Sequence, residues 1–157
     1  LTGFTLALAG GVHAVRLARW AGHRTLAEPL VTVLHAGYAF VPLGALALAV
    51  EIAVPGSVGM AGAQHLWMAG AIGLMTLAVM TRATLGHTGR ALSAGPGTVM
   101  IYAMLLVAVL ARGLAGVWPE MSGGLHAVAG LAWIAAFAGF AVLYGALLLR
   151  LPPSTRR

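Results

Sequence analysis

The chain has 157 residues, of which 61% are hydrophobic and 8% charged, and its mean hydropathy of +0.96 excludes an ordinary soluble globular domain. A formal net charge of +6 would suggest nucleic acid binding in a soluble protein, but the arginines stand between apolar stretches, so we expect no nucleic acid partner. Cysteine is absent, which excludes disulfides, thiolate iron–sulfur clusters and covalently attached c-type haem.

Five apolar stretches predict an all-α fold, a polytopic transmembrane helical bundle that forms a single domain. The first stretch, residues 1–17, is too short to cross a bilayer and ends in an arginine-rich segment, so it is expected to be a partial N-terminal span. The other four are long enough to be complete spans. The expected helices cover about residues 1–17, 29–51, 62–84, 95–117 and 122–150.

Three local signals mark the ends and bends of these helices. Thr25 and Glu28 have the spacing of a capping box before the second helix, and Pro42 predicts a kink within it. Gly86 and Gly89 favour a break at the end of the third helix, which would place His87 on a turn.

The distribution of arginine predicts the orientation in the membrane. Eight of the nine basic residues follow the first, third and fifth helices, and Arg112 alone is expected near the opposite surface. The positive-inside rule assigns the basic side, and with it the C-terminus, to the cytoplasm. We therefore expect a multi-pass protein of the bacterial inner membrane.

Six histidines in so apolar a chain are the main functional signal, because ionisable groups within membrane spans are costly. An inner group is expected near the basic side, where the first two helices are antiparallel neighbours that can bring His13 and His35 face to face. His87 is expected at the same side, close to Arg82 and Arg90. Imidazoles with adjacent arginines are what haem b needs, since the cations can bind its propionates. Each of these histidines, taken alone, could instead satisfy a hydrogen bond.

An outer group is expected near the opposite surface, where His65 begins the third helix and His126 begins the fifth. Met68 follows His65 by three residues on a neighbouring face of the same helix. Imidazole with thioether is a ligand mixture that suits copper, particularly Cu(I). The opposite pairing, with haem at His65 and copper at the inner group through His35 and His87, remains open.

Arg112 and the aromatic residues have simpler expected roles. Arg112 is expected to extend toward the membrane surface or to pair with Glu51, with a propionate as the less favoured partner. Tyr102 and Tyr144 fit interfacial belts. No nucleophile motif, phosphate-binding loop or acid pair occurs, and neither does the adjacent His-His pair of haem–copper oxidases.

The segment AIGLMTLAVMTRATLGHTGR, together with the preceding EPLVTVLHAGYAFVPLG and the following YAMLLVAVLARGLA, resembles the NnrS family of bacterial membrane proteins. The resemblance extends over nearly the whole chain. It implies a haem- and copper-containing membrane protein of nitric oxide metabolism or nitrosative stress defence that binds nitric oxide or iron-nitrosyl species. Members of that family are longer, so the chain resembles their C-terminal portion, and helices N-terminal to it or a second copy are expected partners.

Two other classes of function remain open. A transport or scaffold module would use the histidines to line a polar path or to brace helices. A bis-imidazole electron carrier would hold six-coordinate iron that does not respond to nitric oxide. Both differ from the expected diatomic-binding protein in their optical spectrum.

Overall fold

The computed structural model describes residues 1–149 and is helical throughout, with no strand in that range. The predicted helix end at residue 150 and the three C-terminal arginines lie outside the described residues. The α-helices are α1 (Thr2–Arg19), α2 (Pro29–Ala53), α3 (Met60–His65), α4 (Leu74–His87), α5 (Pro96–Val117) and α6 (Ser122–Leu149). Two short 3₁₀ helices, η1 (Gly22–Thr25) and η3 (Pro119–Met121), stand in connections, and a π-helix, η2 (Leu66–Gly73), joins α3 to α4.

Four helical segments are long and apolar enough to cross a membrane: Pro29–Ala53, Met60–His87, Pro96–Val117 and Pro119–Leu149. The third predicted helix is thus one continuous rod made of α3, η2 and α4. The 18-residue α1 is not among the four spans. The predicted fold class, four complete spans preceded by one partial one, is confirmed.

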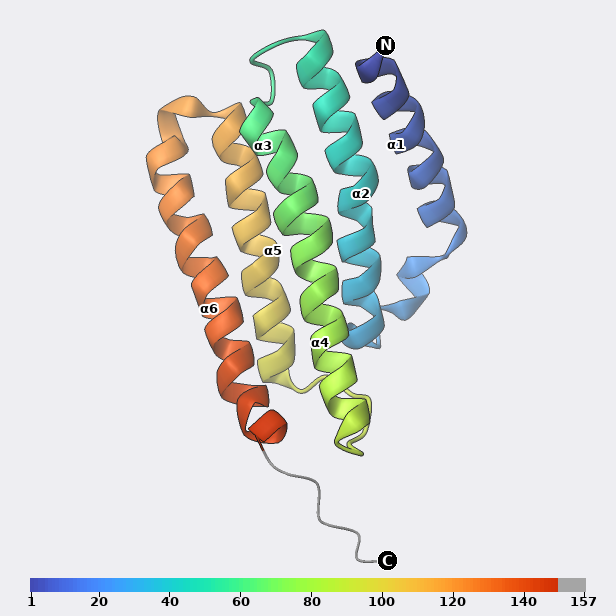
Figure 1. Cartoon of the computed structure of the whole chain (residues 1–157), viewed down its shortest axis with the longest axis vertical. Helices are drawn as coiled ribbons and strands as arrows, with labels where there is room; N and C mark the ends of the chain where they lie inside the picture. Colours follow the sequence, from blue (N-terminus) through green and yellow to red (C-terminus); the bar gives the residue numbers. More distant parts are fainter. Residues whose placement is uncertain (150–157) are drawn as a thin grey trace, which may run out of the picture.

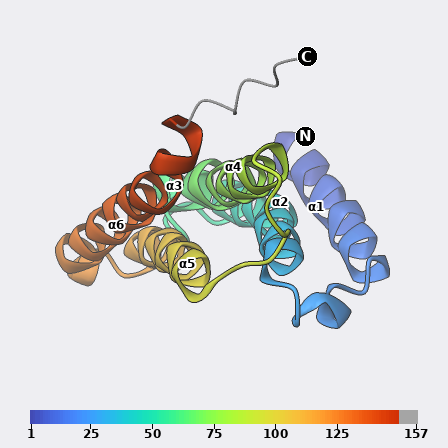
Figure 2. The ribbon, with the colours of Figure 1, turned by 90° about the horizontal axis from the view of Figure 1, so that it is seen from below.

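The α3–η2–α4 rod and the other long helices alternate in direction along the chain, with α1 and α6 at opposite flanks of the molecule (Figures 1 and 2). The rod of α3, η2 and α4 lies between α2 and α5, and α5 packs along α6. Leu74, Leu77, Leu105 and Val109 are fully buried where this rod meets α5. Large apolar side chains on the outward faces, such as Val142 and Ile134, are exposed, as expected of helices that face lipid.

Glycines bring α3 and α5 into close approach at the end of the molecule where α2 joins α3. A methyl group added at Gly116 would lie 2.2 Å from the carbonyl oxygen of Val58, and one added at Gly62 would lie 3.2 Å from that of Gly113. Small residues let helix backbones meet where no hydrophobic force drives them together. This contact sets α3 beside the last turns of α5.

The structure corrects two local predictions. The capping box does not form, because Thr25 lies in η1 and donates its hydroxyl to the carbonyl oxygen of Gly22 (2.7 Å) while Glu28 makes no side-chain cap. His87 is the last helical residue of α4 and does not lie on a turn. The chain turns two residues later at Gly89, whose φ of +67° suits glycine.

Candidate metal or cofactor site

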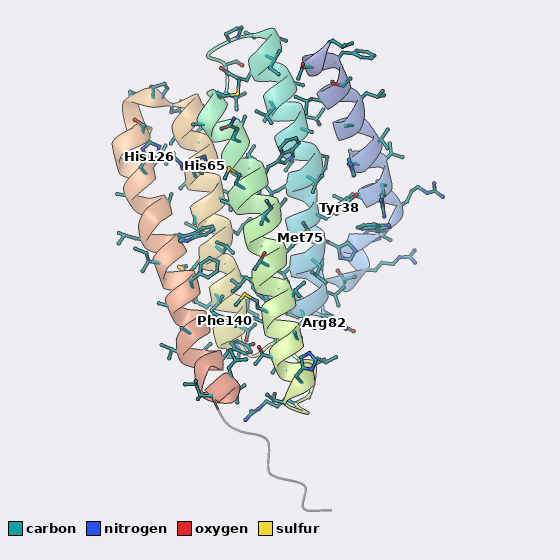
Figure 3. All side chains as sticks on the ribbon, viewed as in Figure 1. Tyr38, His65, Met75, Arg82, His126 and Phe140 are labelled. Atoms are coloured by element: carbon teal, nitrogen blue, oxygen red, sulfur yellow. The ribbon has the colours of Figure 1, made fainter. Side chains whose placement is uncertain are left out.

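A pocket of about 510 Å³ lies between the α3–η2 segment, α5 and α6. Its walls carry two imidazoles, a thioether, a guanidinium and an indole, and small residues form the rest. Figure 3 shows His65 and His126 at the same end of the molecule. The lining residues are His65, Met68, Ala69, Ala108, Arg112, His126, Ala129, Gly130 and Trp133. The predicted outer group is therefore gathered around one cavity.

The imidazole of His65 is held in one tautomer. Its Nδ1 lies 2.6 Å from the carbonyl oxygen of Ala61, one turn earlier. A carbonyl oxygen can only accept, so Nδ1 carries the hydrogen and a neutral ring has its lone pair on Nε2. Histidines that bind metals are commonly oriented in this way by their other ring nitrogen. His65 is thus prepared to act as a ligand through Nε2.

The π-helix begins directly after His65 and extends to Gly73. A π-helix has more residues per turn than an α-helix. His65 and Met68 therefore point in different directions, relative to the side chains of α4, from those that a regular α-helix would give them. The indole of Trp67 anchors this segment by donating its Nε1 hydrogen to the carbonyl oxygen of Val41 (2.7 Å), next to Pro42 in the interior of α2. π-helical turns are frequent at functional sites, where they redirect side chains.

Arg112 lies in the last turns of α5 and lines the pocket. The predicted pair with Glu51 is not formed. Both carboxylate oxygens of Glu51 instead accept hydrogen bonds from loop amides, those of Gly56 (2.8 Å), Val58 (3.0 Å) and Gly59 (2.9 Å). Glu51 therefore closes the connection between α2 and α3 and leaves Arg112 facing the pocket.

The α6 side of the pocket is its more open wall. His126 is exposed in the first turns of α6, and across from it Met68 has 62% of its surface exposed. Trp133 lies further along α6. Its ring packs against Phe137 and beside Gly73, where an added Cβ would lie 3.2 Å from the indole. Trp133 itself has 37% of its surface exposed, so an occupant would be bordered by His126, Met68 and Trp133 and would stay accessible between them.

The predicted inner group does not gather in the same way. His13 and His35 lie on the facing sides of α1 and α2, where Nδ1 of His13 is 2.7 Å from the hydroxyl of Tyr38. Nδ1 of His35 is 3.1 Å from the carbonyl oxygen of Val31, and its ring lies edge-on to Trp20. His87 is exposed at the C-terminal end of α4, and its side chain makes no hydrogen bond to His13 or His35.

Arg82 and Arg90, the arginines of the inner group, are both exposed. Within residues 1–149, no three His, Asp or Glu side chains gather closely enough to hold a metal ion by themselves. The roles predicted for His13, His35, His87, Arg82 and Arg90 in cofactor binding stay predictions.

The sequence alone did not identify Trp133 as a lining residue of this pocket. For Arg112 it favoured roles outside the pocket. The available signal was position: Arg112, His65 and His126 are all polar residues placed within two or three turns of helix ends on the less basic side. It also placed Tyr102 and Tyr144 in interfacial belts, which is wrong, because both are buried and bonded to Thr81 and Thr98 on neighbouring helices.

A family model described as NnrS protein matches residues 1–151, nearly the entire chain. No curated protein and no solved structure gives a significant match. The match agrees with the four apolar spans and with the sequence features that first indicated this relationship. The chain belongs to the NnrS family and is, at the level of that family, a multi-pass membrane protein related to nitric oxide.

Proposed function

We propose that the chain holds haem b in the pocket between α3–η2, α5 and α6 and binds nitric oxide there. The single observation that carries this proposal is that His65, with Nδ1 bonded to Ala61, lines the same cavity as the cationic side chain of Arg112. A non-covalently bound b-type haem needs an imidazole nitrogen to bind its iron, and a cationic side chain can bind its propionates.

The size of the pocket favours a haem over a bare ion. Imidazole nitrogens bind a metal at about 2.0–2.1 Å, so a single ion needs ligands that nearly touch one another. A cavity of about 510 Å³ instead falls within the range of about 300–1,000 Å³ that holds organic ligands and cofactors. Its apolar alanine, glycine and tryptophan walls suit a flat macrocycle.

Each residue has a distinct role in this proposal. His65 binds the iron through Nε2, and Arg112 fixes the orientation of the group by its charge. Trp133 offers an aromatic surface on the α6 side of the pocket. Haem with one protein ligand supplies an open coordination position for a diatomic molecule. His126 stands on the opposite, exposed wall, where a small apolar ligand can enter from the membrane.

Copper is the second candidate for this pocket. His65, Met68 and His126 provide the imidazole and thioether ligands that Cu(I) prefers, and all three line the cavity. Copper would require these three side chains to converge on one point. A bis-imidazole electron carrier would use the same two histidines on either side of an iron, and its spectrum would not change with nitric oxide.

The test is an optical spectrum of detergent-purified protein expressed with haem precursors. We expect a Soret band that shifts on adding nitric oxide and is lost in His65→Ala. His23→Ala, an exposed residue of η1, serves as the matched control and should keep the band. Metal analysis of the same samples separates copper from iron.

The opposing outcomes are specific. A colourless, metal-free wild-type protein would refute the proposal. Loss of the band in His35→Ala or His87→Ala, with His65→Ala unaffected, would move the centre to the inner group. A low-spin spectrum indifferent to nitric oxide would favour the electron carrier.

The setting proposed for this chemistry is the bacterial inner membrane with a cytoplasmic C-terminus. Support comes from the distribution of arginine along the chain: Arg16, Arg19 and Arg24 lie in the last turn of α1 and in η1, and Arg82 and Arg90 lie in the second half of α4 and just after it. Arg112 lies near the opposite connection, between α5 and α6. The exposed apolar face of α1 would adjoin lipid, helices N-terminal to this region or a second copy. The pocket would then open near the outer surface.

A further inference from the structure

We propose that Arg112 makes the pocket an anion site, specific for a planar group with two oxygens on one atom, such as a carboxylate or an ion of the same shape. This goes beyond the proposed binding of haem and nitric oxide, because it assigns to Arg112 a class of anion that the pocket can bind without haem. The propionate form of the inference rests on the proposed haem, whereas the free-anion form stands without it.

The first step is that no carboxylate of the described chain neutralises Arg112. The whole chain has only three acidic residues. Glu28 precedes α2 at the opposite end of the molecule, and Glu120 is exposed in η3. Glu51 is held by three loop amides. Within residues 1–149 the guanidinium forms no ion pair with any of them.

The second step concerns where the guanidinium lies. Arg112 is partly buried, and the residues around it in the cavity are two histidines and a set of apolar side chains. A cation within a membrane span is expensive unless it reaches water or meets an anion. Arginines that merely extend to the membrane surface turn outward along their helix, whereas Arg112 lines an open pocket that it shares with the α3–η2 segment and α6.

The third step is the geometry of the donor group. A guanidinium presents parallel N–H groups that match the two oxygens of a carboxylate, which makes the bond both strong and directional. Nδ1 of His65 already donates to Ala61, and a histidine ring has no such pair of parallel donors. Among the lining residues, Arg112 is therefore the one whose donor geometry matches a carboxylate.

Two sources could supply such an anion: a propionate of a bound haem, or a small free ion. The free-ion source is tested on haem-free protein in detergent by calorimetric titration with sodium formate and with sodium nitrite. If this source is correct, wild type binds at least one of them, and Arg112→Gln weakens that binding at least tenfold. Arg24→Gln, an exposed arginine of η1, is the matched control and should not change it.

The propionate source is tested by loading the same proteins with haem b and with its dimethyl ester, which lacks the negative charges. If it is correct, wild type retains haem b at least tenfold more tightly than the ester, and Arg112→Gln abolishes the preference. The Soret band of the variant should stay at its wild-type position, because His65 is unchanged. Arg112→Lys keeps the positive charge but lacks the parallel N–H donors, so its preference for haem b over the ester should lie between those of wild type and Arg112→Gln. This variant replaces Arg112→Gln in the test if Arg112→Gln does not fold.

The inference is overturned if neither formate nor nitrite binding nor the preference for haem b over its ester depends on Arg112. If wild type takes up no haem in either form, the proposed function fails, and the titrations alone decide this inference: anion binding lost with Arg112 supports it, and no binding by wild type refutes it.

Discussion

Single polar side chains join neighbouring helices throughout the described chain. Tyr102 and Tyr144 are buried and pair with the hydroxyls of Thr81 and Thr98, so that α5 is bonded to α4 on one side and to α6 on the other. In an apolar surrounding a lone hydroxyl has no water to bond, and these pairs are the alternative to burying it unsatisfied. They define how α5 is rotated between its neighbours.

The two pairs should differ in strength. Thr81 also donates its hydroxyl to the carbonyl oxygen of Ala78 (2.9 Å), so it keeps a partner in Tyr102→Phe. Thr98 has Tyr144 as its recorded side-chain partner at 2.6 Å. We expect Tyr102→Phe to cost about 0.6 kcal/mol of unfolding free energy, and Tyr144→Phe about 1 kcal/mol or more.

Unfolding in mixed detergent micelles measures both variants, and double-mutant cycles with Thr81→Ala and Thr98→Ala isolate the two couplings. Equal costs, or a larger cost for Tyr102→Phe, would contradict the argument that Thr81 retains its bond to Ala78.

For single residues, the residue type and its expected depth in the membrane predicted which histidines and methionine line the site. They did not predict that Arg112 also lines it. His65, Met68 and His126 were expected at one surface, and they do share a cavity. The orientation of Arg112 depended on what else would bind Glu51, and three loop amides far from any recognisable motif do so. Whether Glu51 binds Arg112 or the loop amides depends on the geometry of the loop, which cannot be deduced from composition or residue spacing.

Among the elements, the rod Met60–His87 differs most from what its sequence predicts. Hydropathy located it correctly, because length and apolar content suffice for a span. Nothing in LWMAGAIG marks a π-helix, since that conformation is stabilised by contacts with other helices. Two such contacts are visible, the Trp67 bond to Val41 and the packing of Gly70 against Phe40.

Gly44 on α2 should be essential to this arrangement. The indole of Trp67 lies against it, and a methyl group at Gly44 would come within 2.2 Å of the ring. Gly44→Ala should therefore displace Trp67, break its bond to Val41 and lower stability by about 1–3 kcal/mol. Because η2 follows His65 directly, haem retention should fall as well.

Gly145→Ala in α6 is the control, since a methyl group there meets nothing within 4 Å and alanine is the better helix former. It should leave stability unchanged or slightly raised. Circular dichroism during thermal unfolding and the tryptophan emission maximum report the two effects. If Gly44→Ala and Gly145→Ala behave alike, Trp67 does not fix the π-helix.

At the scale of the whole molecule, arginine and the candidate pocket are distributed unevenly along the bundle. The candidate pocket lies at the end where α2 joins α3 and α5 joins α6, which carries Arg112. The remaining described arginines lie in the last turn of α1, in η1, in the second half of α4 and just after α4. This polarity follows from composition and was predictable, whereas the shared pocket required the close approach of α3 and α5 at Gly62, Gly113 and Gly116.

The absence of cysteine allows a direct test of the proposed orientation. Glu120→Cys places one thiol in η3 at the pocket end, and Ser93→Cys places one in the connection between α4 and α5 at the basic end; both positions are exposed. If arginine retention sets the topology, a membrane-impermeant maleimide added to intact spheroplasts should label Glu120→Cys at once. Ser93→Cys should react only after permeabilisation. The reverse pattern would turn the pocket toward the cytoplasm, and its ligands would then have to arrive from inside the cell.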